Sequence, residues 1–212
     1  MNIIRDIVFW DVDTQIDFME PYGKLYVPGA EKLKANLAFL TEMGAGRGRL
    51  SGSADAHMPN DREFNVWPEH CVYGTPGQHK VPESSINGTL YVPSVRLSSA
   101  LLSEVVAYNG QVIFEKQETD VRTNPNVKPF MNLIRPKLVV VYGVVSEICV
   151  NLAVDFFTRE LGYETVVVVD AIKELDMSET LSCRSGWETL GVKMLNTRDI
   201  IDLLDGLDAR AR

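Results

Sequence analysis

The stretch KLVVVYGVVSEICVNLAVDFFTRELGYETVVVVDAI, residues 137–172, decides the fold. Residues 137–143 form a short run of β-branched and apolar side chains, which predicts a buried strand. Residues 150–162 then have apolar side chains at helical spacing and end at a glycine, and 164–172 return to a β-branched run. Strand, helix and strand in this order predict a βαβ crossover between parallel strands.

The same alternation continues on both sides of this stretch. Upstream, apolar runs predict strands over 3–10 and 111–116, with a weaker strand over 49–55, and helical spacing predicts helices over 31–44 and 94–107. Downstream, the pattern predicts a helix over about 178–190, a short strand around 192–195 and a tail helix over 198–207. We therefore expect one domain over 1–212, of the three-layer α/β class, with a mostly parallel six-stranded sheet and helices on both faces.

Composition and charge exclude several classes of protein. The chain has 212 residues and a formal net charge of −8, whereas binding to nucleic acid or an anionic membrane needs a concentrated basic surface. No apolar run approaches the ~18 to 20 residues needed to cross a bilayer, and acidic residues come too early for a secretory signal. The 3 cysteines have no paired spacing, so free thiols and a cytoplasmic location are expected.

Polar residues follow the ends of four predicted strands. Ligands of open α/β sheets bind beyond the carboxyl ends of the strands, so these positions are the first candidates for a site. They hold Asp13, Asp55, Lys116 and Cys149. Two acids, a cation and a thiol are thereby predicted to meet at one edge of the sheet.

Cys149 is the candidate nucleophile. It lies in the first turn of a predicted helix, with Ser146 as a candidate cap, and the positive end of a helix favours a thiolate over a thiol. A free cysteine in a helix is more often a small hydrophobic residue, but the place of Cys149 after the most distinct strand favours the catalytic interpretation. Cys71 and Cys183 lack such a place and are interpreted as structural.

Asp13 and Lys116 are the candidate partners of the thiol. A carboxylate at this strand end can accept the thiol proton and later deliver it to a leaving amine. Lys116 can hold Asp13 in place and stabilise negative charge that develops in the site. Asp11 and Asp17, in the same DVDTQID segment, are interpreted as turn and cap residues.

A group of metal ligands is predicted in the long segment that follows residue 56 and is rich in Pro, Gly and Asn. Asp55, His57, Glu63 and His70 supply two carboxylates and two imidazoles within sixteen residues, a set that suits Zn²⁺, Mn²⁺ or Fe²⁺. Solvated side chains on a loop are the alternative for these residues. Trp67 is either an anchor for the loop or an aromatic wall for a planar substrate.

Five motifs together resemble the cysteine hydrolase superfamily, called isochorismatase-like, that includes the nicotinamidases. They are DVDTQIDF at 11–18, DAH at 55–57, WPEHCVYGTPG at 67–77, FEK at 114–116 and GVVSEICV at 143–150. The resemblance runs through nearly the whole chain in order, and it implies the isochorismatase-like hydrolase fold.

The resemblance also implies the catalytic groups. It assigns catalysis to Asp13, Lys116 and Cys149, and the backbone N–H groups of Val145 and Cys149 to an oxyanion hole. It further implies a cis peptide bond between Val144 and Val145.

The metal and substrate residues follow in the same way. The resemblance implies one divalent metal, with zinc expected first and manganese or iron as alternatives, held by Asp55, His57, Glu63 and His70. Glu63 stands where some members of the superfamily have another histidine. The substrate would contact two aromatic side chains, Phe18 and Trp67.

Two departures from the nicotinamidase pattern bear on the substrate. Residues 117–126, QETDVRTNPN, replace small and aromatic residues, and Thr14 and Ile16 replace residues that are more common in the opening motif. We expect a metal-assisted amide hydrolase, foremost a nicotinamidase that converts nicotinamide to nicotinate and ammonia in NAD salvage.

The alternatives are a related hydrolase of a carbamoyl, ureido or other small amide, and a non-catalytic protein that binds a metal or ligand on the same fold. Isochorismatase activity is disfavoured, because isochorismatases lack this nucleophile and metal set. The resemblance further suggests a homo-oligomer.

Overall fold

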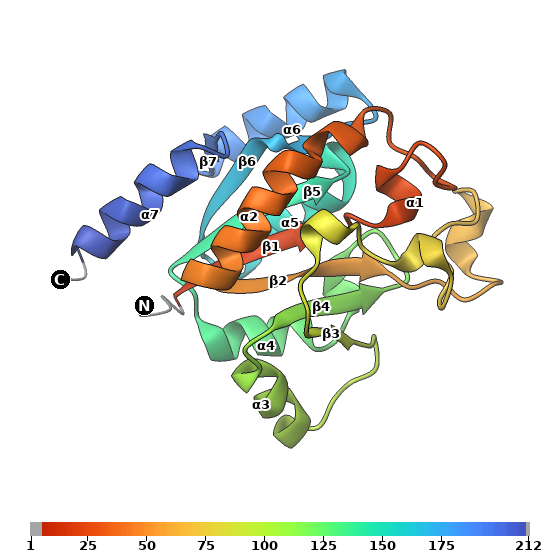
Figure 1. The fold of residues 1–212 in the computed structure, drawn as a ribbon, viewed down its shortest axis with the longest axis horizontal. Helices are drawn as coiled ribbons and strands as arrows, with labels where there is room; N and C mark the ends of the chain where they lie inside the picture. Colours follow the sequence, from red (N-terminus) through yellow and green to blue (C-terminus); the bar gives the residue numbers. More distant parts are fainter. Residues whose placement is uncertain (1–5, 211–212) are drawn as a thin grey trace.

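Seven parallel strands form the central sheet of the protein (Figure 1). The computed structural model describes residues 6–210, apart from the side chains of residues 208 and 210. In the order in which they lie across the sheet, the strands are β3 (Thr89–Val92), β4 (Gln111–Lys116), β2 (Arg49–Asp55), β1 (Ile7–Val12), β5 (Leu138–Val144), β6 (Glu164–Lys173) and β7 (Lys193–Leu195). The parallel α/β fold is confirmed.

The sheet has one strand more than the six that the sequence predicts. The additional strand is β3, whose four residues lie within a segment that we interpreted as a loop. It pairs only with β4 at the edge of the sheet, and its pattern is too short to stand out from its surroundings. The predicted strand over 3–10 is found as β1, and residues 3–5 lie outside the described part of the chain.

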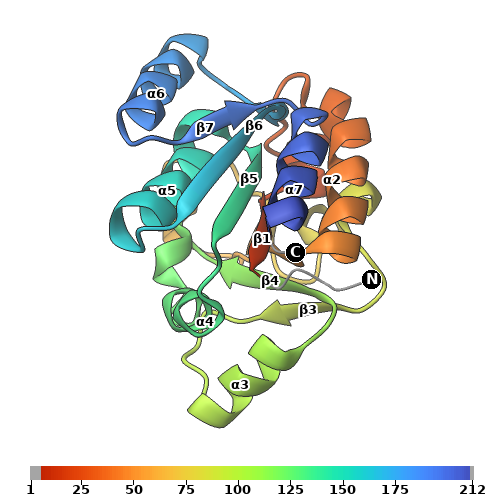
Figure 2. The ribbon, with the colours of Figure 1, turned by 90° about the vertical axis from the view of Figure 1, so that its left-hand side faces the viewer.

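Helices cover both faces of the sheet (Figure 2). One core, on one face, includes buried side chains from α3 (Ser99–Ala107), α4 (Val127–Ile134), α5 (Asn151–Asp155) and α6 (Met177–Thr189). The second core, on the opposite face, includes buried side chains from α1 (Ile16–Met19), α2 (Lys34–Arg47) and α7 (Asp199–Arg210). Along β1, Val8, Trp10 and Val12 face the first core, while Ile7 and Phe9 face the second, as the alternation of a strand requires.

Several element boundaries differ from the sequence-based expectation. The helix predicted over 31–44 begins as a 3-10 turn, Ala30–Leu33, and α2 continues to Arg47. Gly44 does not end it: a Cβ at Gly44 would lie 3.0 Å from Phe9 and Leu50, so this glycine allows the helix to pack closely on the sheet.

The other differences concern short elements. The helix predicted over 150–162 is the short α5 between two π-helical turns, Ser146–Val150 and Phe156–Glu160. The helix predicted from residue 94 begins at Ser99, where Ser98 caps it, and α4 was not predicted. These differences leave the order of strands and crossovers intact.

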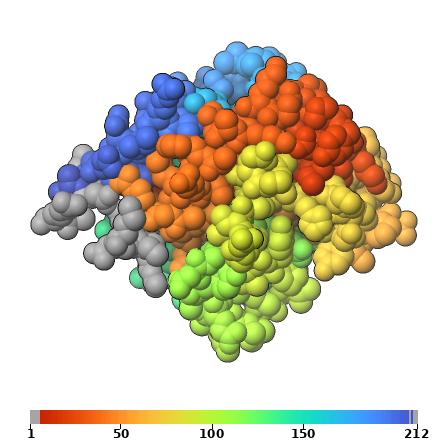
Figure 3. All heavy atoms as spheres, viewed as in Figure 1, coloured from red at the N-terminus to blue at the C-terminus, as the bar shows by residue number. Residues whose placement is uncertain are grey.

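Two long connections meet beyond the carboxyl ends of the central strands. The segment after β1 and the long segment after β2 lie against each other on the surface (Figure 3). An antiparallel bridge joins Gln15 to Lys80, and an ion pair joins Lys24 to Glu69 at 2.7 Å. At the end of β5, Gly143 has φ 118°, and a Cβ there would lie 2.1 Å from the carbonyl oxygen of Val12, so only glycine fits.

No helix within residues 6–210 is long and apolar enough to cross a bilayer.

Candidate active site

Three candidate catalytic residues meet at the carboxyl ends of three strands. Asp13 follows β1 and adopts φ 49°, with its N–H donating to the carbonyl oxygen of Ser53 on β2 at 3.2 Å. Lys116 is the last residue of β4, and Cys149 lies in the π-helical turn after β5. A left-handed conformation is uncommon for a residue other than glycine, and it occurs here at a candidate catalytic position.

Lys116 is the centre of this group. Its side chain is 1% exposed, and its Nζ lies 3.0 Å from Oδ2 of Asp13 and 3.8 Å from Sγ of Cys149. It also donates a hydrogen bond to Oδ1 of Asp55. Burial alone would lower the pKa of Lys116, but the carboxylates of Asp13 and Asp55 outweigh it and raise the pKa well above its ordinary value. Lys116 is therefore a permanent buried cation between two acids.

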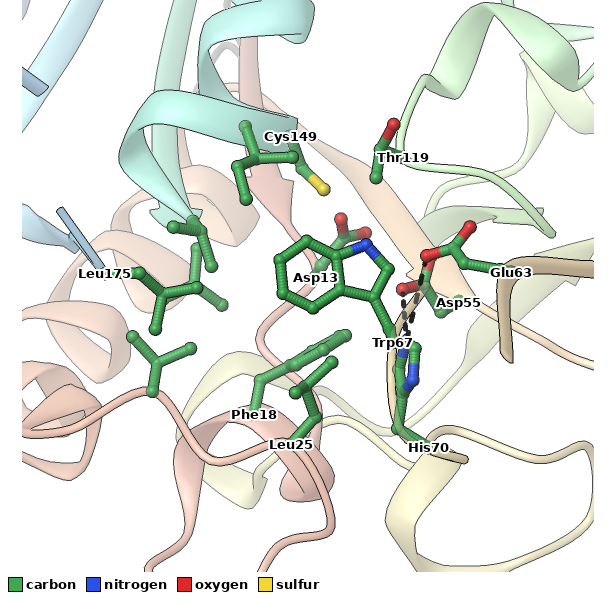
Figure 4. A pocket seen from close by; sticks show the side chains of 14 residues that line it. Asp13, Phe18, Leu25, Asp55, Glu63, Trp67, His70, Thr119, Cys149 and Leu175 are labelled. Carbon is green, nitrogen blue, oxygen red and sulfur yellow. Dashed lines mark ion pairs between the residues drawn. The ribbon is translucent and has the colours of Figure 1, made fainter. Parts of the chain in front are cut away.

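Cys149 lies beside the carboxylate of Asp13, as Figure 4 shows. Burial raises the pKa of the Cys149 thiol, and the negative charge of Asp13 raises it further, against the opposing effect of Lys116. The expectation that the helix end favours a thiolate is therefore wrong in direction. Ser146 does not cap the turn either: Val145 precedes the turn, and the Ser146 hydroxyl is buried without a hydrogen-bond partner. A thiol that stays protonated needs a base beside it.

Asp13 is the carboxylate that is placed to be that base. It is 1% exposed, and burial raises the pKa of its carboxyl, although the Lys116 ammonium opposes this effect. A base with a raised pKa holds a proton more readily than an ordinary aspartate, so it is better able to accept one from the thiol and return it.

Asp11 has a different role from the turn residue that the sequence suggested. It lies within β1, is 0% exposed, and forms an ion pair with the buried Lys80 at 2.9 Å. The hydroxyl of Thr14 donates to the same carboxylate and is hydrogen-bonded to Ser84 at 2.6 Å. This network joins the segment that carries Asp13 to residues 80–84.

Gln15 makes a second connection of the same kind. Its side-chain amide donates to the carbonyl oxygens of Asp55 at 2.8 Å and Gln78 at 2.7 Å, and its carbonyl accepts the N–H of Asp55 at 2.6 Å. The catalytic and metal-ligand segments are thus fixed to each other by buried hydrogen bonds.

The four predicted metal ligands form one cluster. One ligand atom from each of Asp55, His57, Glu63 and His70 lies within 4.8 Å of the others. Nε2 of His57 and of His70 are 3.7 Å and 3.6 Å from Oδ2 of Asp55, and Nε2 of His70 is 3.9 Å from Oε1 of Glu63. Separations of this size leave room for an ion between the four groups.

The hydrogen bonds around the cluster fit a metal as well. Nδ1 of His57 is held by Asp61 at 3.1 Å and Nδ1 of His70 by the carbonyl oxygen of Pro68 at 2.7 Å, so each ring turns its Nε2 into the cluster. Nε2 of His57 is buried and has no hydrogen-bond partner, as expected of an atom reserved for a metal. Burial opposes ionisation of Asp55, but Lys116 and the imidazoles hold its pKa well below the usual range, so the cluster keeps a carboxylate ligand.

A pocket opens onto both groups of residues (Figure 4). It contains about 420 Å³ of empty space, including its open mouth. Its lining includes Asp13, Cys149, Asp55, Glu63 and His70 together with the two aromatic residues that we predicted, Phe18 and Trp67. The remaining lining is Leu25, Val27, Thr119, Val144, Val145, Ile148 and Leu175.

Sequence reasoning missed several of these pocket residues. Leu25 and Val27 come from the connection after β1, and Leu175 comes from the connection between β6 and α6. Lone apolar residues in loops carry no periodic signal, so no pattern singled them out. Thr119 is part of the unusual segment after Lys116, and that departure from the family pattern was its signal.

The peptide bond between Val144 and Val145 is cis, as the resemblance implies. Val145 and Cys149 both line the pocket, at the two sides of the turn after β5. Their role as an oxyanion hole stays a prediction.

Comparisons with known proteins bear on the family. A sequence model of the isochorismatase domain matches residues 96–183. The nicotinamidase of Acinetobacter baylyi is 22% identical over 90% of this chain and 92% of its own. The nicotinamidase/pyrazinamidase of Mycobacterium tuberculosis is 26% identical over 87% of this chain and 95% of its own.

Solved structures share the fold. An isochorismatase-like hydrolase from Alkaliphilus metalliredigens has a TM-score of 0.73 at 20% identity and covers 93% of this chain and 98% of its own. The pyrazinamidase of Pyrococcus horikoshii in complex with zinc has a TM-score of 0.70 at 23% identity, covering 90% and 99%. N-carbamoylsarcosine amidase from Thermoplasma acidophilum has a TM-score of 0.68 at 20% identity, covering 91% and 96%.

The family match, the two curated relatives and the shared fold agree with the motifs and with the grouping of Asp13, Lys116 and Cys149 at one edge of the sheet. Residues 96–183 match the isochorismatase domain, and the chain as a whole is similar to the isochorismatase-like cysteine hydrolases, among them the two nicotinamidases named above.

Proposed function

We propose that the protein hydrolyses the carboxamide of a small uncharged aromatic compound, foremost nicotinamide, with Cys149 as the nucleophile. The observation that carries the proposal is the contact of Lys116 with Asp13 and with Cys149, beside a cluster of four metal ligands in one pocket. Amide hydrolysis needs a nucleophile, a proton carrier and charge stabilisation, and these residues supply the three roles.

The proposed reaction proceeds through a thioester. Asp13 accepts the thiol proton as Cys149 Sγ attacks the amide carbon, and the carbonyl oxygen becomes an oxyanion held by the N–H groups of Val145 and Cys149. Asp13 then returns the proton to the departing nitrogen, so ammonia leaves and a thioester remains. Asp13 next takes a proton from water, whose oxygen attacks the thioester, and the acid is released as the proton returns to Cys149.

The raised pKa values support this order of events. The pKa values of Cys149 and Asp13 are both raised above those of exposed groups of their kind. The carboxyl of Asp13 therefore accepts the thiol proton more readily than a carboxyl of ordinary pKa would. Lys116 stays charged throughout, so it offsets the negative charge that moves between Asp13 and the oxyanion.

A divalent metal held by Asp55, His57, Glu63 and His70 would act as a Lewis acid that binds and polarises a nitrogen or oxygen of the substrate or a water molecule. Asp55 also holds Lys116 in place, because it accepts a hydrogen bond from the Lys116 ammonium.

The lining of the pocket favours a neutral, planar substrate. Among the described residues, no lysine or arginine side chain lines it, and Lys116 below it is already paired with two carboxylates. A carbamoyl amino acid carries a carboxylate, which would meet acidic and apolar side chains here without a cationic side chain to pair with it. Nicotinamide has no such charge, and Phe18 and Trp67 offer its ring aromatic surfaces.

The test measures ammonia released from a panel of amides by protein loaded with zinc, manganese or iron. The panel contains nicotinamide, pyrazinamide, benzamide, acetamide and N-carbamoylsarcosine. Cys149→Ala is the inactive variant, and Cys183→Ala, which changes a half-buried thiol outside the pocket, is the matched control.

Turnover of the aromatic amides that disappears in Cys149→Ala and survives in Cys183→Ala would support the proposal. Turnover of N-carbamoylsarcosine alone would keep the nucleophile and replace the substrate class. Full activity of Cys149→Ala would contradict the mechanism. The free state of all three described cysteines is consistent with a reducing compartment, and we propose that the reaction serves NAD salvage in the cytoplasm.

A further inference from the structure

The carboxylate of Glu147 joins the nucleophile turn to the connection between β6 and α6. Glu147 lies in the turn Ser146–Val150, two residues before Cys149, and it does not line the pocket. Its Oε1 accepts the N–H groups of Leu175 at 2.9 Å and Asp176 at 2.7 Å, and its Oε2 accepts the hydroxyl of Thr180 at 3.0 Å. Three hydrogen bonds to a charged acceptor are strong enough to fix the position of a short connection.

The connection that Glu147 holds forms one wall of the pocket. Leu175 lines the pocket although the residue is 45% exposed, so it stands at the mouth. Figure 4 shows Leu175 on the side of the pocket opposite to Thr119 and Glu63. An apolar side chain at that place can contact the ring of a bound substrate.

The hydrogen bonds of this connection converge on one residue. Leu175 and Asp176 both donate their backbone N–H to Glu147, and the side chain of Asp176 is used to cap α6, through Ser178 and Glu179. If the Glu147 carboxylate is removed, both N–H groups lose their acceptor, and the connection is free to move away from the pocket.

From this geometry we propose that Glu147 is a positioning residue for specificity: it sets the distance between the Leu175 wall and the sulfur of Cys149, and thereby the preference for a ring-bearing substrate. The inference rests on the proposed function for the identity of the substrate. It does not rest on turnover, because the wall also acts on any reagent that reaches Cys149.

The direct test compares the alkylation of Cys149 by iodoacetamide and by its N-phenyl derivative, followed by mass spectrometry of the Cys149 peptide. In both reactions the sulfur displaces iodide and loses its proton, so only the ring differs. The rate with the N-phenyl reagent divided by the rate with iodoacetamide should fall about fivefold to tenfold in Glu147→Ala, because the lost contact is similar to the burial of about one to two methylenes. Glu147→Gln keeps an acceptor for both N–H groups and should leave the ratio within about twofold.

Matched variants separate this role from a purely structural one. Thr180→Val removes the third hydrogen bond but neither backbone bond, and should leave the ratio unchanged. Leu175→Ala should lower the ratio as Glu147→Ala does, and the double variant should be no lower than Leu175→Ala alone, because both changes remove the same contact. Glu147→Asp, with a shorter side chain, should give an intermediate ratio and replaces Glu147→Ala if that variant does not fold.

Two results would overturn the inference. An equal loss of both alkylation rates in Glu147→Ala would mean that Glu147 acts on the nucleophile turn itself, and full additivity with Leu175→Ala would mean that it does not act through the wall. In turnover, Glu147→Ala should raise KM for nicotinamide about tenfold with kcat within about threefold, and leave acetamide unaffected. Absence of any turnover in the unaltered protein would contradict the proposed function and leave the alkylation ratios to decide this inference.

Discussion

Lys116 pairs with two carboxylates that have different roles in the proposed chemistry. Its ammonium contacts Asp13 and Asp55, and all three side chains are at most 3% exposed. We expect Lys116→Met to leave Asp13 without a cation and Asp55 with only the imidazoles of the cluster, to lower stability by about 3–5 kcal/mol and to lower kcat/KM at least about 1,000-fold. Urea unfolding and ammonia release measure the two effects. Lys137→Met, which removes an exposed cation paired with Asp6, is the control, and equal losses in the two variants would contradict this role.

The pKa of Cys149 provides the second prediction at this scale. Burial raises it, and Asp13 adds to the effect, so the thiolate should become abundant only well above neutral pH. The rate of alkylation by iodoacetamide should therefore rise with pH through the neutral range without reaching a plateau there. Asp13→Asn removes one of the negative charges, so the profile should move to lower pH even though amide turnover is lost. A shift to higher pH would mean that Asp13 favours the thiolate, against the assignment.

At the scale of elements, the short 3-10 turn Arg62–Asn65 organises the metal ligands. Its N-cap, Asp61, accepts the N–H of Glu63 through Oδ1 at 3.3 Å and holds Nδ1 of His57 through Oδ2 at 3.1 Å. One side chain thus orients two of the four ligands. We expect Asp61→Asn to weaken metal binding about tenfold to 100-fold, measured by titration with Zn²⁺ and by metal analysis. Glu69→Gln alters an exposed acid on the same segment and should leave the affinity unchanged. Equal affinities in the two variants would contradict the role of Asp61.

The same elements show what a sequence can predict. Asp13, Lys116 and Cys149 were identifiable because each lies at or after the end of a strand whose apolar run is distinct, and parallel strands bring their carboxyl ends to one edge. Leu175 was not identifiable, because its place depends on how the connection after β6 folds back toward Glu147. The direction of the Cys149 pKa was also mispredicted, since burial and a neighbouring acid outweigh the end of a helix, and neither is visible in the sequence.

At the scale of the whole molecule, the central sheet holds the catalytic residues at the carboxyl ends of its strands. The long connections after β1 and β2 form the part of the site that lies beyond the sheet. The parallel order of strands followed from the alternation of apolar runs, while the edge strand β3 and helix α4 lacked a distinct pattern. The connections are joined by contacts between residues far apart in the chain, such as Asp11 with Lys80 and Gln15 with Asp55. Pairings of this kind need the folded chain, so no local pattern reveals them. A homo-oligomer stays a prediction.

The ion pair of Asp11 and Lys80 is one of these long-range connections, and both of its side chains are 0% exposed. Asp11→Leu leaves the ammonium of Lys80 without its carboxylate, and Lys80→Met leaves the carboxylate of Asp11 with only the hydroxyl of Thr14. Each single variant should therefore lose about 3–5 kcal/mol of stability in urea unfolding, whereas the double variant should recover most of it, because two apolar side chains suit the interior. Losses that simply add would mean that the pair is not coupled. Turnover by the double variant then tells whether the network also positions Asp13: recovered stability with kcat still reduced would assign it that second role.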